Sequence, residues 1–383
     1  MRKKQFFILF SLTLIVVLLI NCTKTGVAAL DASVFKALPD VIIAPANNLQ
    51  TPQKIALGKS LFWDPILSGG KDVACASCHH SSAGYTDNLD LAIGVNGIGV
   101  GASRHFASPN DIPFAKRNTP TIVNAAFNGI DINGIYNPLT APMFDDNRVT
   151  SLETQSIQPI KTLEEMMGHN FTSASALDSV VSRLKGIPQY VQLFNDVFGT
   201  NSVTSENLGK AIASFERAIL SNNSPYDKYI RGDASAMSNT QIQGMRLFQN
   251  DGCIKCHSGA MFSDYQLHIL SVPDNSKRPT DAGANGTYAF RTPSLRNLSA
   301  TAPYMHSGVF TSLDQVLNFY DQVGKGNSQN SHVSRNSLDG NLQPFNDNDK
   351  AFIIQFLSSL NDNSFDKTIP TSVPSALHVG GNL

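Results

Sequence analysis

Two short segments of the sequence share the pattern Cys-x-x-Cys-His, at residues 75–79 and 253–257. This spacing places two thiols where they can form thioethers with the two vinyl groups of a haem, and the adjacent histidine then lies under the iron as proximal ligand. A thioredoxin-like redox pair or half of a zinc cluster also uses paired cysteines, but neither needs that histidine. We therefore predict two covalently bound c-type haems, held by Cys75, Cys78, His79, Cys253, Cys256 and His257.

The first 22 residues are typical of a secretory signal. A basic start at residues 2–4 precedes an almost wholly apolar stretch at residues 6–20. Cys22 follows in a run that resembles a lipobox and predicts a lipid anchor, although Asn21 is larger than the small residue usual there. The alternatives are an ordinary signal peptide cleaved nearby or an uncleaved anchor. We expect export to the periplasm or cell envelope, with contact to the membrane only through an acylated Cys22.

Composition narrows the function further. The 29 basic and 30 acidic residues nearly balance, so nothing suggests nucleic acid as a partner. Once Cys22 is set aside, the remaining four of the five cysteines are the two haem-motif pairs. The disulfides common in exported proteins would therefore compete with haem attachment for the same four thiols.

Three motifs recur in the same order around the two haem motifs. A Gly-x-x-Leu-Phe segment precedes each haem motif, a Thr-Pro turn ending in asparagine follows it, and a Thr-Ser-Leu-acid helix start comes next. The pairs are residues 58–62 and 244–248, 119–124 and 292–297, and 150–153 and 311–314. Internal duplication of a one-haem domain explains this repetition.

The expected fold is mainly α, with two cytochrome-c-like haem domains. Amphipathic patterns predict helices over residues 52–62, 205–220 and 239–248, and no βαβ rhythm is present. We place the signal at residues 1–22, an N-terminal peroxidatic haem domain at 46–220 and a C-terminal electron-transfer haem domain at 236–362. The polar run at 221–238 fits a boundary, and the tail after Asp366 is expected to be loosely ordered.

The two copies differ at one informative position. A helix capped by Ser312 carries Tyr320 on its apolar face, where the phenol is either a core residue or an iron ligand. In the first copy the same alignment position holds Pro159, which has no ligand to offer, and Gln155 and Glu165 lie nearby. An open iron beside a carboxylate is what peroxide chemistry needs.

With these residues in hand, the chain resembles the bacterial di-haem cytochrome c peroxidases and the related methylamine-utilisation (MauG-like) di-haem enzyme. The resemblance runs from about residue 57 to residue 360. It is carried by residues 57–65, both haem motifs, and residues 117–121, 152–166, 291–297 and 303–306.

The resemblance implies a role for each haem. The haem on His79 would bind peroxide, with Glu165 as distal acid/base and Gln155 as distal amide. The haem on His257 would store and relay electrons. A calcium ion between the domains is also implied, held by the Asn118 side chain and the carbonyls of Thr301 and Pro303, since calcium prefers oxygen ligands. Family members often form homodimers.

Three departures from the family pattern matter. Tyr320 stands where the peroxidases usually have a methionine ligand, as it does in the methylamine-utilisation enzyme. Val95 stands where classical peroxidases park a histidine on the active iron, which predicts a site that needs no reductive activation; His105 is the rival candidate for that ligand. Phe144 occupies the stretch where the family has a tryptophan between the haems, and Trp63 is the only tryptophan.

The leading hypothesis is a di-haem c-type peroxidase that reduces hydrogen peroxide to water with electrons from a small periplasmic cytochrome c or cupredoxin. One alternative is a MauG-like oxidase that acts on a protein or organic partner through high-valent haem. Another is a non-enzymatic di-haem electron carrier with both irons six-coordinate.

Overall fold

The computed structural model describes residues 29–383, so the expected signal at residues 1–22 and the candidate acylation site Cys22 lie outside the described residues. We call the two groups of helices the first and the second lobe. The longer helices of the first lobe are α1 (Pro52–Trp63), α4 (Ala176–Lys185), α5 (Pro188–Phe198) and α6 (Ser205–Arg217). Two single helical turns lie between α1 and α4, namely α2 (Cys75–Cys78) and α3 (Leu152–Gln155). After α7 (Pro225–Ile230), the second lobe holds α8 (Asn239–Asn250), α9 (Leu313–Gly324) and α10 (Lys350–Ser358).

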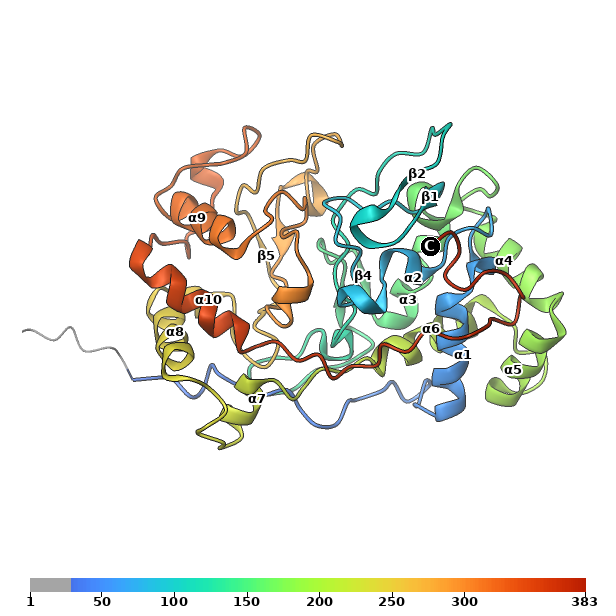
Figure 1. Cartoon of the computed structure of the whole chain (residues 1–383), viewed down its shortest axis with the longest axis horizontal. Coiled ribbons are helices and arrows are strands. Elements are labelled where there is room, and N and C mark those ends of the chain that lie inside the picture. Colours follow the sequence, from blue (N-terminus) through green and yellow to red (C-terminus); the bar gives the residue numbers. More distant parts are fainter. Residues whose placement is uncertain (1–28) are drawn as a thin grey trace, which may run out of the picture.

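Strands in the described chain are short and pair only as antiparallel two-residue ladders. They are β1 (Gly97–Ile98) with β2 (His105–Phe106), β3 (Pro142–Met143) with β4 (Val149–Thr150), and β5 (Leu267–His268) with β6 (Phe290–Arg291). The expectation of a mainly helical protein is confirmed. Figure 1 shows the two groups of helices on either side of a central region of loops and short strands. No helix among residues 29–383 is long and apolar enough to cross a membrane.

The helices begin where the sequence patterns predict. Thr51 caps α1 by accepting a hydrogen bond from Lys54 N, and Pro52 occupies the first turn, where its missing N–H costs nothing. The helix predicted over 205–220 ends at Arg217 instead, and α8 continues to Asn250.

Close helix crossings that depend on glycine occur in both lobes. A Cβ on Gly58 of α1 would lie 2.0 Å from the carbonyl oxygen of Ala211 in α6. A Cβ on Gly244 of α8 would lie 1.9 Å from the carbonyl oxygen of Phe352 in α10. These backbones can therefore approach each other only because the crossing residue has no side chain.

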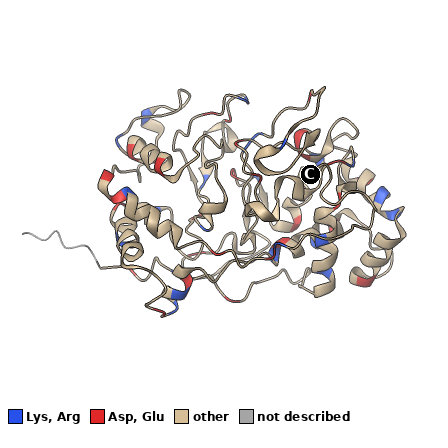
Figure 2. Cartoon of the chain, viewed as in Figure 1, with Lys and Arg blue, Asp and Glu red and all other residues tan. Residues whose placement is uncertain are grey.

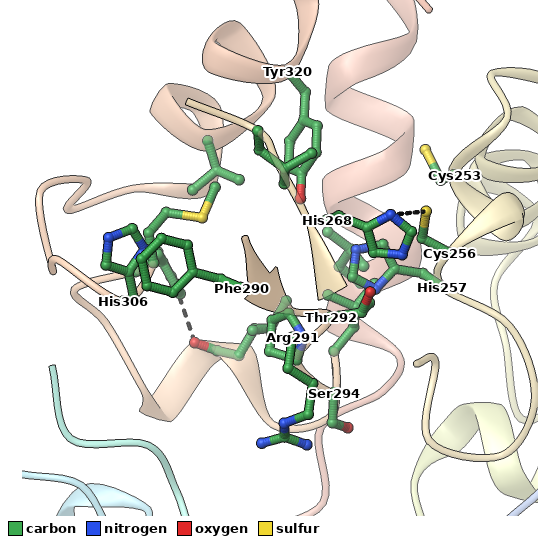
Figure 3. A pocket seen from close by; sticks show the side chains of 18 of the residues that line it. Cys253, Cys256, His257, His268, Phe290, Arg291, Thr292, Ser294, His306 and Tyr320 are labelled. Atoms are coloured by element: carbon green, nitrogen blue, oxygen red, sulfur yellow. Dashed lines mark hydrogen bonds between the residues drawn. The ribbon is translucent and has the colours of Figure 1, made fainter. Parts of the chain in front are cut away.

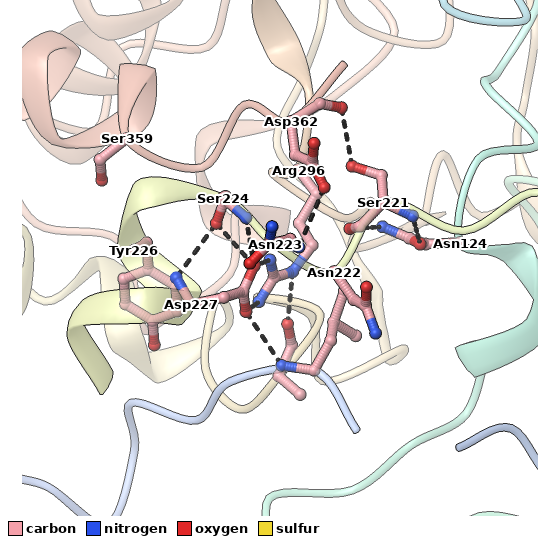
Figure 4. A network of polar contacts seen from close by, with 12 residues as sticks. Asn124, Ser221, Asn222, Asn223, Ser224, Tyr226, Asp227, Arg296, Ser359 and Asp362 are labelled. Carbon is pink, nitrogen blue, oxygen red and sulfur yellow. Dashed lines mark hydrogen bonds and ion pairs between the residues drawn. The ribbon is translucent and has the colours of Figure 1, made fainter. Parts of the chain in front are cut away.

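The two Thr-Pro turns end in asparagines that meet at Ser221 (Figure 4). Asn124 Nδ2 donates to the Ser221 carbonyl at 2.8 Å, and Ser221 N donates back to Asn124 Oδ1 at 2.8 Å. Asn297 Nδ2 donates to Ser221 Oγ at 2.8 Å, while Asp362 N donates to Asn297 Oδ1 at 2.7 Å. Both asparagines adopt positive φ, 64° and 61°. The chain segments that follow α6 and α10 are thus held together through matching residues of the two lobes.

The polar run at 221–238 contains buried residues in its first part and is exposed at residues 231–235. Ser224 and Asp227 are fully buried. The Arg296 guanidinium binds the Asp227 carboxylate through two bonds of 2.7 and 3.0 Å, and Leu38 N donates to the same carboxylate at 3.0 Å (Figure 4). Buried charges persist where such bonds satisfy them. Placing a domain boundary in this run stays a prediction.

The expectation of a loosely ordered tail after Asp366 is wrong. The tail leaves the second lobe, runs along the molecule and ends beside α2 (Figure 1). Gly380 N donates to the Trp63 carbonyl at 2.7 Å, Ser77 Oγ donates to the Gly380 carbonyl at 2.9 Å, and Ser375 Oγ donates to buried Asp64 at 2.6 Å. Small and polar residues in this tail pair their backbone with the first lobe, a use that composition does not reveal.

Basic and acidic residues are interspersed along both lobes (Figure 2). This distribution agrees with the near balance of 29 basic and 30 acidic residues in the whole sequence.

The glycine crossings can be tested by adding one methyl group. Gly58→Ala and Gly244→Ala are each expected to destabilise the protein by about 1–3 kcal/mol, because overpacking forces α1 from α6 or α8 from α10. Thermal unfolding of the haem-loaded protein measures the effect. Gly340→Ala is the matched control, since a Cβ there meets nothing within 4 Å. Equal melting temperatures for all three variants would contradict the packing argument.

Candidate active site

The two motif histidines are oriented in the same way. His79 Nδ1 lies 3.1 Å from the Tyr85 carbonyl oxygen, and His257 Nδ1 lies 2.8 Å from that of Phe262. When Nδ1–H donates to a carbonyl, Nε2 is left unprotonated and available to a metal. Burial lowers the pKa of both imidazoles, which favours this neutral form. Tyr85 and Phe262, which supply the carbonyls, both have positive φ, 58° and 53°.

The motif cysteines are unbonded to one another in the described chain. Burial raises the pKa of Cys78 and of Cys253 to about 12 in each case. A redox-active cysteine needs a lowered pKa, so these thiols do not suit a thioredoxin-like site. Each pair lies beside a neutral histidine, as attachment of a haem requires.

A cavity of about 320 Å³ opens in the second lobe in front of Cys253, Cys256 and His257. Its walls are mostly apolar and include Leu270 and Leu317. First-lobe residues of the Thr-Pro turn also line it, namely Asn118, Thr119, Pro120 and Thr121. A planar apolar cofactor held by two cysteines and a histidine fits this cavity.

Tyr320 enters the same cavity from α9. Ser312 and Gln315 form a capping box with two reciprocal hydrogen bonds, which stabilises the N-terminus of α9. In Figure 3 the Tyr320 hydroxyl points into the cavity, on the side away from His257. Burial raises the pKa of the phenol, and the neighbouring Cys256 and Cys253 add to the shift. The side chain can therefore reach the cavity interior as a ligand would.

In the first lobe, Glu165 lies on one wide helical turn, Leu163–Met167, which follows the Pro159–Lys161 turn. The Thr162 carbonyl accepts from Glu165 N at 3.2 Å, which starts this turn. Gly94 packs against it so closely that a Cβ would lie 2.3 Å from the Glu165 carbonyl oxygen. The turn that carries the acid is thus fixed by backbone contacts.

Glu165 is coupled electrostatically to the first haem motif. Burial is the main cause that raises the pKa of Cys75 and Cys78, and the charge of Glu165 adds to both shifts. Burial raises the pKa of Glu165 itself to about 7, Glu164 adds to the shift and Arg148 opposes it. A carboxyl group with a pKa near neutrality can both take up and release a proton. Gln155, the other predicted distal group, ends α3, four residues before Pro159.

The segment around Val95, which stands where classical peroxidases park a histidine, packs directly on the Glu165 turn. Val95 is only 8% exposed, and its backbone N–H donates to the Glu164 carbonyl at 3.1 Å. His105 is exposed on β2, with Nδ1 3.0 Å from the Ser103 carbonyl oxygen of its own turn. Val95 thus presents an aliphatic side chain at this turn, and His105, the other candidate ligand, lies at the surface.

Sequence reasoning missed His268, which it treated as exposed or structural. His268 lines the second cavity, with Nε2 2.9 Å from Asp264 Oδ2 and Nδ1 2.5 Å from Asp339 Oδ2. The bond to Asp264 raises the pKa of His268 to about 11, with Cys256 and Asp339 adding to the shift. An imidazole held between two carboxylates therefore borders the second haem motif. His306, predicted near that haem, lines the cavity and stacks on Phe290 with the ring centres 3.6 Å apart (Figure 3).

It also missed Glu216, a buried acid on α6. Its charge raises the pKa of Cys75, and burial raises its own pKa to about 8. The sequence did offer a signal for this residue. Glu216 is an acid that lies at helical spacing between the apolar residues Ile212 and Ile219, on the face expected to be buried.

Comparison with known proteins identifies the family to which this chain belongs. A family model described as di-haem cytochrome c peroxidase matches residues 52–235. The methylamine utilization protein MauG of Methylophilus methylotrophus is 33% identical over 332 residues, which cover 84% of this chain and 86% of that protein. The chain belongs to the di-haem cytochrome c peroxidase family.

Relatives of this di-haem peroxidase are named either as MauG or as cytochrome c peroxidase. Cytochrome-c peroxidase IdrP1 of Pseudomonas sp. (strain SCT) is 34% identical over 333 residues, covering 77% of this chain and 79% of that one. The chain is therefore an oxidoreductase, and its family implies two haems.

Solved structures agree on the fold. A MauG-like protein associated with microbial copper homeostasis superposes with a TM-score of 0.68 at 24% identity, covering 88% of this chain and 97% of that one. The diheme peroxidase BthA from Burkholderia thailandensis E264 gives a TM-score of 0.65 at 21% identity, covering 89% and 97%.

Covalent attachment can be counted directly. Replacing Cys75 and Cys78 by alanine is expected to reduce the covalent haem content from two to one, and replacing Cys253 and Cys256 is expected to do the same, because each pair supplies the thioethers of one haem. Intact-mass spectrometry of the purified protein gives the count. A variant of either pair that keeps two covalent haems would contradict the assignment.

Proposed function

We propose that this di-haem peroxidase reduces hydrogen peroxide to water at the haem held by Cys75, Cys78 and His79. Electrons come from a small periplasmic cytochrome c or cupredoxin and pass through the haem held by Cys253, Cys256 and His257. The reaction joins one peroxide, two protons and two electrons to give two waters.

One observation carries the proposal, namely the difference between the two sites. In the second lobe Tyr320 points into the cavity in front of His257. In the first lobe the corresponding position is Pro159, and Glu165 stands near the attachment cysteines with a pKa of about 7. One site is thus equipped with a ligand and the other with a proton-transfer group.

The haem, when bound, supplies the iron that accepts peroxide and the electrons that reduce it. The Glu165 carboxylate takes the proton from one peroxide oxygen and returns it to the other oxygen, which departs as water. Gln155 orients peroxide through its amide. The Nδ1–H bond from His79 to the Tyr85 carbonyl keeps the proximal imidazole in one orientation and increases its basicity.

Internal duplication is part of the proposal, and the contacts of the two lobes support it. Gly58 and Gly244 make equivalent helix crossings, and Asn124 and Asn297 make equivalent bonds to the segments after α6 and α10. We infer two cytochrome-c-like domains, residues 46–220 and 236–362. The first-lobe turn at 118–121 lines the second cavity, which supports electron transfer across this contact.

We also propose a calcium ion between the domains. Asn118 Nδ2 donates to the Leu89 carbonyl at 2.7 Å, which commits the amide nitrogen and leaves Oδ1 as the atom to face a cation. Asn118, Thr301 and Pro303 all line the same cavity. These oxygens would hold the ion and fix the contact between the domains. The calcium ion would take no part in the reaction itself.

Export to the periplasm, anchoring at Cys22 and assembly as a homodimer belong to the same proposal.

A second candidate is a MauG-like oxidase acting on a protein or organic partner. Tyr320 in the cavity and the relatives named MauG favour it. Slow peroxide turnover with every small cytochrome or cupredoxin donor, together with peroxide-dependent oxidation of a partner, would favour this candidate over the first.

Glu165→Gln tests the proton-transfer role. We expect kcat/KM for peroxide to fall by about 10²- to 10⁴-fold with haem content unchanged, because the amide cannot accept the proton. In the unmodified protein kcat/KM should fall as the pH drops below about 7, since the carboxylate form is then lost. Glu206→Gln, whose side chain is 74% exposed on α6, is the control and should keep full activity. Equal activity of the two variants would sink the proposed role.

Tyr320→Phe tests the ligand. If the phenol closes the second iron, its removal should convert that haem to a high-spin form, visible in the absorption and EPR spectra of the resting protein. Tyr304→Phe is the control, because Tyr304 lines the same cavity but donates its hydroxyl to the Leu298 carbonyl at 3.1 Å. An unchanged spectrum for Tyr320→Phe would refute the ligand assignment.

A further inference from the structure

A loop of the second lobe, residues 273–286, lies against the first lobe at several charged contacts. We call it the bridging loop. Lys277 Nζ lies 2.7 Å from Asp90 Oδ1, and Asn275 Nδ2 donates to the other oxygen of the same carboxylate at 2.9 Å. Asp281 binds the Arg117 guanidinium at 2.6 Å. The loop is therefore fixed on the first lobe at both ends.

Between these contacts, Arg278 reaches the turn that carries the distal acid. Arg278 Nη2 lies 3.4 Å from Glu164 Oε1, and the two side chains are only 22% and 15% exposed. Glu164 precedes Glu165 in the same turn, and its carbonyl accepts from Val95 N at 3.1 Å. The bridging loop thus supplies a cation to the residue beside Glu165.

We propose that Arg278 is a positioning residue for peroxide reduction: through its ion pair with Glu164, the second lobe holds the Glu165 turn in place and sets the proton affinity of Glu165. The inference rests on the proposed function, since it deepens the role given to Glu165.

The physical argument follows from the charges around Glu165. Burial raises its pKa most, Glu164 adds to the shift and Arg148 opposes it, while Glu165 in turn raises the pKa of Cys75 and Cys78. Arg148 is itself engaged by Asp146 at 2.7 Å and lies over the Phe144 ring. Arg278 is the cation that faces Glu164, so its loss leaves an uncompensated negative charge next to Glu165. Like charge disfavours ionisation, and the pKa of Glu165 must then rise.

Cyanide binding to the resting ferric protein measures this without turnover. A distal carboxylate must accept the proton of hydrogen cyanide, so the association rate falls as the pH drops through the pKa of Glu165. We expect Arg278→Ala to raise that midpoint by roughly half to one pH unit and to slow association about threefold at pH 7. Arg278→Lys should restore most of the shift, because it retains the charge. Lys277→Ala, which removes the neighbouring ion pair of the same loop, should leave the midpoint unchanged.

The pair itself is tested by a double-mutant cycle. Glu164→Gln should lower the midpoint, and Arg278→Ala should have little further effect in the Glu164→Gln background, because no charge remains to be compensated. A midpoint that is the same in Arg278→Ala and Lys277→Ala would overturn the positioning role alone. Absence of cyanide binding in every variant, the unmodified protein included, would overturn the open first site and this inference with it.

Discussion

The relative placement of the two lobes depends on the bonds that converge on Ser221. Asn124 holds its backbone and Asn297 holds its hydroxyl, so one residue receives the Thr-Pro turn of each lobe. Both asparagines adopt a left-handed conformation that few side chains tolerate, and asparagine tolerates it best after glycine. The buried Asp227–Arg296 pair lies next to this point and ties the N-terminal arm to it through Leu38. In the proposed function electrons pass from one lobe to the other, and this polar core holds the two lobes in one relative position.

Contacts that repeat between the two lobes surround two unlike sites. The helix crossings at Gly58 and Gly244 and the bonds of His79 and His257 recur from lobe to lobe. The sites differ where one lobe has Tyr320 and the other has Pro159 and the Glu165 turn. Such a division lets one fold serve two chemical roles, because the ligand set changes while the support of the proximal histidine stays the same.

The sequence predicted the haem motifs, the helices that frame them and the difference at Tyr320, because each is a local pattern or a repeat. It did not predict the surroundings of His268, since the two flanking carboxylates come from positions 264 and 339 and only folding brings them together. The buried contacts of the polar segment at 221–227 could not be predicted for a similar reason, because its partners Arg296 and Leu38 are far away in sequence. The tail after Asp366 was misjudged because its bonds to the first lobe use mostly backbone groups, which carry no residue signature.

The docked tail has a consequence for how the protein folds. Ser77, inside the first haem motif, donates to the carbonyl of Gly380, and Gly381 pairs with Val73 just before that motif. The segment around Cys75 and Cys78 therefore depends on a partner 303 positions away in the sequence. Loop closure over such a separation is slow, so local contacts form first and the first lobe is completed only when the tail docks.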